Sequence, residues 1–257
     1  MGSGSGPRRT GASDLVRTVL ALLAILPGLA AGVAVLAATR DRRRAINRTI
    51  AVWGDLGTRA AGIRLDVVGA AQLAVRPAVF VFNHQSGVDP ILLCALLRRD
   101  FVGVAKQEIR RNPLLGPAFA FAGVVFVDRS DRAQALRALE PALDRLRAGI
   151  AIAIAPEGTR SPGAEVRAFK KGAFRIAMAA GVPIIPVVIL NARDVLPRGA
   201  RVMTPATVRV VVHDPVSTLD WTLEALDASI ERVRQIFVET LAQARDSRST
   251  TTATDRV

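Results

Sequence analysis

The sequence predicts a layered α/β fold: a largely parallel central sheet of about seven strands flanked by helices, preceded by an N-terminal pair of apolar helices that associates with a membrane. Two observations predict the sheet. Short runs of apolar and β-branched residues recur along the chain, and helical stretches separate most of them. A third observation, an uncharged stretch of 22 residues near the N-terminus, predicts the apolar helices.

The expected strands are almost continuous in apolar residues, a pattern typical of strands that are buried on both faces. They lie at residues 63–68, 78–82, 101–105, 124–127, 150–155, 184–190 and 207–213. The expected helices lie near residues 45–62, 90–99, 113–122, 131–148, 170–180 and 220–244. In a parallel sheet ligands bind beyond the carboxyl ends of the strands, so the residues that follow each strand are the candidates for function.

The uncharged stretch Thr18–Thr39 is as long as a membrane span, which needs roughly 20 apolar residues. Pro27 and Gly28 interrupt it, and arginines flank both of its ends. Because basic residues favour the cytoplasmic side, we expect a re-entrant or monotopic helical pair on the cytoplasmic face of the cell membrane. A single span and a secretory signal peptide are the alternatives.

The chain therefore divides into four parts. Residues 1–13 are expected to be a flexible Gly/Ser-rich leader, and residues 14–62 an apolar helical element that anchors the protein to the membrane. Residues 63–245 form the α/β domain, and residues 246–257 are expected to be a disordered polar tail.

The net charge of +13 (35 basic and 22 acidic residues) indicates an anionic partner. A single cysteine and two histidines argue against a disulfide framework and against Cys- or His-rich metal sites, so no metal is expected. An aromatic content of 4%, the lack of tyrosine and scattered basic residues argue against nucleic acid. A phosphorylated substrate and a membrane lipid surface are the remaining anionic partners.

A histidine and an aspartate follow the second expected strand, in the segment Asn83-His84-Gln85-Ser86-Gly87-Val88-Asp89-Pro90. Histidine is the common general base near neutral pH, and a carboxylate bonded to one ring nitrogen would fix its tautomer. An alternative role for Asp89 is purely structural, as the N-cap of a helix that starts at Pro90.

Other candidate residues follow later strands. The loop Pro156-Glu157-Gly158-Thr159-Arg160 combines glycine and hydroxyl residues with an arginine, a composition that can hold a phosphate. Lys106, Lys170 and Lys171 are the only lysines in a chain that otherwise uses arginine, and lysine also binds phosphate oxygens. Arg129 follows the strand at 124–127.

Taken in order, the segments NHQSGVD, GVVFVDR, PEGTR and VPIIPV, with the flanking AKQE and FKKGAF, resemble the motifs of one family over roughly residues 63–215. This is the PlsC-like family of glycerolipid acyltransferases, of the lysophosphatidic acid acyltransferase type. Ala155 departs from the pattern, since the family commonly has Phe before PEGTR.

The resemblance implies transfer of a fatty acyl group from acyl-CoA or acyl carrier protein to the sn-2 hydroxyl of 1-acyl-sn-glycerol 3-phosphate, giving phosphatidic acid. Glycerol 3-phosphate or another lysophospholipid is the alternative acceptor. His84 would be the base, oriented by Asp89. The acceptor phosphate would be bound by Lys106, Arg129, Arg160 and Lys171, with Glu157, Gly158 and Thr159 in the same site. No cofactor is implied, since the thioester is already activated.

A serine hydrolase and a basic binding module are the rival functions. The chain has no G-x-S-x-G segment, which argues against the hydrolase.

Overall fold

The structure is a computed structural model that describes residues 11–128, 140–160 and 165–254, with side chains up to residue 247. Arg129 therefore lies outside the described residues. The helices are α1 (Ala12–Leu23), α2 (Ile25–Thr39), α3 (Arg42–Ala61), α4 (Asp89–Leu97), α5 (Leu115–Phe121), α7 (Glu140–Arg147), α8 (Gly172–Ala180) and α9 (Leu226–Thr254). Short 3₁₀ helices are η1 (Ala70–Ala74), η2 (Gln107–Arg111) and η3 (Ala192–Asp194).

The predicted seven-stranded sheet is confirmed. Its strands are β1 (Ile63–Val68), β2 (Val79–Phe82), β3 (Phe101–Lys106), β4 (Val125–Val127), β5 (Ala151–Ile154), β6 (Ile184–Ile189) and β7 (Ala206–Val212). Their order is β1-β7-β6-β2-β5-β3-β4, and within the described sheet every pairing is parallel except that of β6 with β7. The carboxyl ends of β2, β5 and β3 therefore lie next to one another. The candidate residues directly follow these strand ends in the chain.

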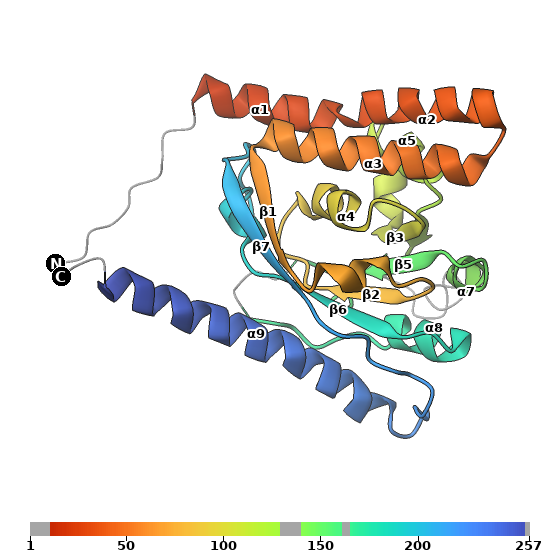
Figure 1. Cartoon of the computed structure of the whole chain (residues 1–257), viewed down its shortest axis with the longest axis vertical. Coiled ribbons are helices and arrows are strands. Elements are labelled where there is room, and N and C mark those ends of the chain that lie inside the picture. Colours follow the sequence, from red (N-terminus) through yellow and green to blue (C-terminus); the bar gives the residue numbers. More distant parts are fainter. Residues whose placement is uncertain (1–10, 129–139, 161–164, 255–257) are drawn as a thin grey trace.

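Strand β2 shows why the sheet is buried on both faces. All four of its residues are buried, and successive side chains point to opposite sides. Phe80 and Phe82 pack in the core beneath α3 and α4, whereas Val79 and Val81 pack in the core formed with α7, α8 and α9. Helices thus cover both faces of the sheet, as Figure 1 shows.

The apolar N-terminal stretch forms two helices, but they lie end to end along the top of the molecule instead of folding back on each other (Figure 1). The break at Ala24 has a physical cause in Pro27, whose ring conflicts with a helical carbonyl at Leu23, four residues earlier. The chain first reverses between α2 and α3 (Figure 1). The choice among a re-entrant pair, a monotopic pair and a single span stays a prediction.

Gly28 does not break the helix; it continues α2 and faces α3. A Cβ atom there would come within 3.0 Å of the Thr49 carbonyl oxygen, and one at Gly32 would overlap the Thr49 hydroxyl. Small residues four apart allow two helix backbones to approach closely. The glycines that look like breakers in the sequence are helix-packing contacts.

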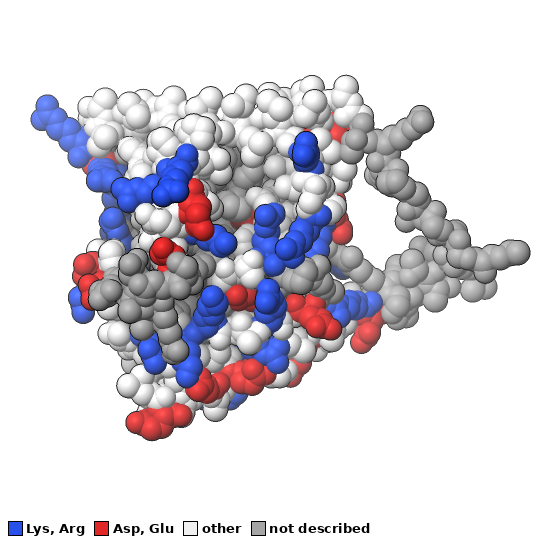
Figure 2. All heavy atoms as spheres, turned by 180° about the vertical axis from the view of Figure 1, so that it is seen from behind, with Lys and Arg blue, Asp and Glu red and all other residues white. Residues whose placement is uncertain are grey.

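The outward face of α1 and α2 is apolar. Eight large hydrophobic side chains on it are 42–56% exposed: Leu15, Val16, Val19, Leu20, Leu22, Leu23, Leu26 and Val33. By length and composition the stretch Ala12–Thr39 is long and apolar enough to cross a membrane. In Figure 2 this edge of the molecule is an uncharged band, and Lys and Arg side chains gather beneath it.

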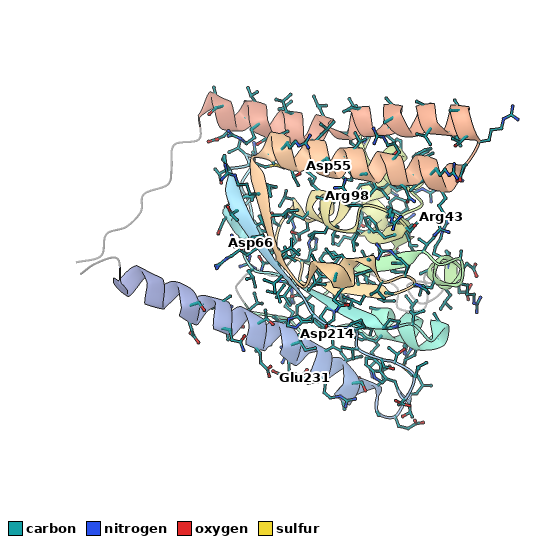
Figure 3. The ribbon with its side chains drawn as sticks, viewed as in Figure 1. Arg43, Asp55, Asp66, Arg98, Asp214 and Glu231 are labelled. Atoms are coloured by element: carbon teal, nitrogen blue, oxygen red, sulfur yellow. The ribbon has the colours of Figure 1, made fainter. Side chains whose placement is uncertain are left out.

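Helix α3 fastens the apolar pair to the α/β domain. Asp55 on α3 and Arg98, which follows α4, lie side by side (Figure 3) and form a bidentate ion pair with N–O distances of 2.6 and 3.0 Å. Arg43 and Asn47, also on α3, both donate to Asp100 at the start of β3. Helices α3 and α4 approach each other closely at Gly54, where a Cβ atom would collide with the backbone of Cys94 and Ala95.

The predicted disordered tail begins too early. Helix α9 continues through residue 254, since residues 246–254 contain neither proline nor glycine to stop it. At the other end α1 begins at Ala12, two residues before the predicted boundary. The expected helix at 131–148 is described only from Glu140, as α7.

Gly54→Ala is expected to destabilise the protein. The new Cβ would lie 2.5 Å from the Ala95 nitrogen and 2.6 Å from the Cys94 carbonyl carbon, which forces α3 away from α4. Overpacking of this kind costs about 1–3 kcal/mol. Chemical denaturation should show a lower free energy of unfolding, whereas Gly103→Ala, where no atom lies within 4 Å of the new Cβ, should unfold like the parent. Equal stability of the two variants would contradict the close packing.

Candidate active site

His84 and Asp89 are joined at the carboxyl end of β2. The Asp89 Oδ2 atom lies 2.6 Å from His84 Nδ1 and also accepts hydrogen bonds from the backbone N–H groups of Gln85 (3.0 Å) and Ser86 (3.1 Å). The Asp89 side chain is 1% exposed, whereas that of His84 is 27% exposed. One buried oxygen therefore holds the imidazole and the loop behind it, and leaves the other side of the ring accessible.

Asp89 does not have the alternative role of an N-cap. Helix α4 begins at Asp89 itself with Val88 as its N-cap, and the carboxylate points back to the preceding loop. The three donors that it binds all precede the helix. Its role is to shape the loop and orient the histidine.

Two more contacts fix this loop to the sheet. The Asn83 side chain exchanges hydrogen bonds with the backbone of Ile189 on β6 (2.9 and 2.8 Å), so it extends the pairing of β2 with β6. The Ser86 hydroxyl donates to the Leu196 carbonyl oxygen at 2.8 Å. The polar residues of the segment are thus largely used to hold its own shape.

Glu157 joins this loop to the one that follows β5. Its Oε1 accepts a hydrogen bond from the His84 backbone N–H (3.2 Å), and its Oε2 accepts one from the Arg167 backbone N–H (3.1 Å). The residue is 4% exposed and does not line the cavity described next. These two contacts of Glu157 hold the loops together, and the substrate contact expected from the sequence stays a prediction.

A cavity of about 420 Å³ opens at His84. Its polar side is formed by His84, Asp89, Lys106, Thr159 and Arg160. The rest is apolar and extends between β3, α4 and α5 to the N-terminal helices; it includes Ile25, Thr49, Ile50, Trp53, Leu93, Cys94, Phe101, Gly103, Ala118, Phe119 and Ala155. Its size is in the range of small-molecule sites, which span roughly 300–1,000 Å³.

Most of the residues that line the cavity are apolar. Burial raises the pKa of the Cys94 thiol in its wall to about 12, so this cysteine stays protonated and behaves as an apolar residue. Gly103 leaves space where a larger side chain would project into the cavity. Ala155, where the sequence departs from the family pattern, also lines the cavity. No cluster of three metal-ligating side chains occurs in the described part of the chain.

The predicted phosphate-binding residues separate into two groups. Lys106, Thr159 and Arg160 line the cavity with His84. Gly158 has a φ of +76°, which favours glycine, and the Lys170 side chain lies against it. Lys171 is instead paired with Asp227 on α9, with an N–O distance of 2.6 Å, and does not line the cavity.

Several residues of the site could not be selected from the sequence. Lys170, beside Gly158, is nearer to the Glu157–Arg160 loop than Lys171, although the two are adjacent in the chain. Gly103, Trp53 and Thr49 line the cavity but stand in ordinary strand and helix patterns. The one feature of the sequence that points to this part of the cavity is the small size of Gly103 within an apolar strand.

His213 is not part of the site. Its Nε2 lies 2.9 Å from the Thr240 hydroxyl on α9, and burial lowers its pKa. Its contact is with α9 rather than with the cavity.

Comparisons with known proteins identify the family of this chain. A family model described as Acyltransferase matches residues 64–190. The chain is 33% identical over 185 residues to the 1-acyl-sn-glycerol-3-phosphate acyltransferase of Saccharomyces cerevisiae, covering 71% of this chain and 61% of that protein. It is 35% identical over 175 residues to the human 1-acyl-sn-glycerol-3-phosphate acyltransferase alpha, covering 67% and 62%. The chain therefore spans less than two thirds of the length of these curated relatives.

Among solved structures the chain is similar to the 1-acyl-sn-glycerophosphate (LPA) acyltransferase PlsC from Thermotoga maritima. The TM-score is 0.71 and the identity 30%, and the match covers 89% of this chain and 96% of that one. The match therefore extends beyond residues 64–190, the part that the family model matches.

Proposed function

Because the chain belongs to the PlsC-like acyltransferase family, we propose that it transfers a fatty acyl group from an acyl thioester to the sn-2 hydroxyl of 1-acyl-sn-glycerol 3-phosphate. One observation carries the proposal: an Asp-oriented histidine stands where a deep apolar cavity meets a cationic mouth. An imidazole can activate an alcohol, the cations can bind a phosphate, and the cavity can hold a hydrocarbon chain.

In the proposed mechanism His84 is the general base. With its Nδ1–H donated to Asp89, the free Nε2 lone pair accepts the proton of the acceptor hydroxyl as its oxygen attacks the thioester carbonyl. The tetrahedral intermediate then collapses and breaks the carbon–sulfur bond. The thiolate leaves and takes the proton from the imidazolium. The products are the diacylated phosphate lipid and a free thiol, and no cofactor takes part.

The position of the phosphate site follows from the same geometry. Lys106 and Arg160 are the cations that share the cavity with His84, so a phosphate bound by them would place a neighbouring hydroxyl near the imidazole. Arg160 is exposed and its guanidinium lies close to Gly87 in the His84 loop. We propose Lys106, Thr159 and Arg160 as the acceptor site, and Lys171 is left out of it.

The apolar outer face of α1 and α2 supports attachment to a membrane surface. Both substrates of the proposed reaction carry fatty acyl chains. Ile25 of α2, together with residues of α3, also forms part of the cavity wall. A helix with one apolar face can lie in the plane of the interface and bury that face in lipid. The proposed substrates would then reach the cavity from the membrane side.

His84→Ala is expected to remove most of the activity without unfolding the protein. The loss of a triad-type base lowers turnover by roughly four to six orders of magnitude. Acyl transfer should be measured by mass spectrometry with acyl-CoA and acyl carrier protein as donors and a panel of acceptors. His213→Ala is the matched control, with near-normal turnover expected. Retention of the parental rate by His84→Ala would rule out His84 as the base.

Arg160→Ala is expected to weaken binding of the phosphorylated acceptor. Loss of a charge-assisted hydrogen bond is worth about 1.5–3 kcal/mol, so the acceptor KM should rise roughly 10- to 100-fold with a smaller effect on the donor KM. Steady-state kinetics with each substrate varied in turn separates the two. An unchanged acceptor KM together with a weakened donor would place the donor, not the acceptor, at Arg160.

Gly103→Leu is expected to shorten the acyl chains that the enzyme uses. A Cβ at this position meets no atom within 4 Å and the site lines the cavity, so the added side chain would fill space without displacing the wall. Competition between donors of different chain length should shift toward shorter ones. Ala179→Leu, at an exposed position of α8 outside this cavity, is the control. An unaltered preference in Gly103→Leu would show that the acyl chain lies elsewhere.

A further inference from the structure

A second concave surface lies on the flank of the molecule, at the β4 edge of the sheet. One cavity of about 240 Å³ is lined by Arg42, Arg43, Asn47, Asp100 and apolar residues, and one of about 320 Å³ by Gln107, Arg110, Phe126 and others. Arg42 and Arg145 line both. The two cavities therefore form one continuous surface, here called the flank groove, and His84 is not among its lining residues.

The flank groove carries unbalanced positive charge. Asp100 is the only carboxylate among its lining residues, and it is paired with Arg43 at 2.6 Å. Within the described ranges no ion pair is formed by Arg42, Arg110 or Arg145. Among the described residues, three guanidinium groups thus line the groove without a carboxylate partner.

The floor of the groove is apolar. Phe126, Val124, Ala122 and Ile46 are among its lining residues, and the Arg110 guanidinium lies 5.8 Å from the centre of the Phe126 ring. A fully solvated ion does not need such a floor. A ligand with an anionic head and an apolar body does.

The position of the groove favours a membrane lipid. Arg42 opens α3 directly after the turn from α2, whose outer face exposes Leu26 and Val33. Helix α7, which carries Arg145, lies on the same side of the molecule as this turn (Figure 1), and Arg43 Nη1 donates to the Ala148 carbonyl oxygen just beyond α7. The groove therefore begins where the apolar face of α2 ends.

We propose that the flank groove binds the phosphate headgroup of an anionic membrane lipid, separately from the acceptor site at Arg160. Guanidinium groups bind phosphate oxygens bidentately, and the apolar floor receives the part of the lipid next to the headgroup. The lipid fixes the rotation of the protein on the bilayer, so that the α3–α7 flank faces the surface. The proposal rests on the proposed membrane attachment through α1 and α2, and adds the lipid class and its binding residues.

The test compares vesicle binding by two double variants of the full chain. Arg110→Gln with Arg145→Gln removes two charges from the groove. Arg64→Gln with Arg232→Gln is the control and removes two exposed arginines elsewhere. Arg64 lies on β1, at the opposite edge of the sheet from β4, and Arg232 lies on α9. Vesicles of phosphatidylcholine alone and of phosphatidylcholine mixed with phosphatidylglycerol are the probes, read by co-sedimentation.

The parent and the control pair are expected to bind the anionic vesicles more tightly than the neutral ones. An arginine near an anionic surface contributes about fivefold to affinity, so the groove pair should bind anionic vesicles roughly 25-fold more weakly. Its binding to neutral vesicles should be unchanged, and circular dichroism should confirm that it is folded.

Four results would overturn the proposal. An equal loss in the two double variants would mean that net charge alone acts, and no loss in the groove pair would mean that the groove does not contact lipid. Failure of the parent to bind either kind of vesicle would refute the membrane attachment as well. Binding to both kinds without preference for the anionic one would refute the groove alone.

Discussion

A single buried oxygen, Asp89 Oδ2, determines the geometry of the site. It receives the His84 imidazole and two consecutive backbone N–H groups, and the residue is almost completely buried. A buried carboxylate oxygen is costly unless donors bind it, and the donors to Oδ2 all belong to the loop itself. A change in the shape of the loop would break these hydrogen bonds. Glu157, at the end of the neighbouring strand, acts in the same way: its carboxylate accepts hydrogen bonds from the His84 N–H and the Arg167 N–H.

The sheet and the N-terminal helices contribute different halves of the site. Parallel strands β2, β5 and β3 bring His84, Arg160 and Lys106 to one edge, which is the cationic mouth of the cavity. Its apolar depth is closed by α2 and α3, which glycines and the Asp55–Arg98 ion pair hold against the domain. The element proposed to attach to the membrane thus also forms a wall of the chamber proposed for the acyl chain.

The sequence predicts the sheet, the strand-end position of His84 and the apolar helices, because continuous apolar runs and local motifs can be recognised in consecutive residues. It does not predict the choice between Lys170 and Lys171, because a shift of one residue at the start of α8 turns one side chain to Gly158 and the other to Asp227. The sequence does not predict the cavity walls either. Gly103 on β3 and Trp53 on α3 are far apart in the chain, and only the folded structure places them around one cavity. Gly28 is misread for the same reason, since its close neighbour Thr49 is on another helix.

We propose that Asp89 holds His84 with its Nε2 lone pair free for the acceptor hydroxyl. ¹⁵N NMR of the histidine rings near neutral pH measures this tautomer directly, and the second histidine, His213, can be assigned by its own substitution. The account predicts a protonated, hydrogen-bonded Nδ1 and an unprotonated Nε2 for His84 in the parent, with this signature lost in Asp89→Ala. A proton on Nε2 with a bare Nδ1 would contradict it, because the ring would then have no lone pair to offer the substrate.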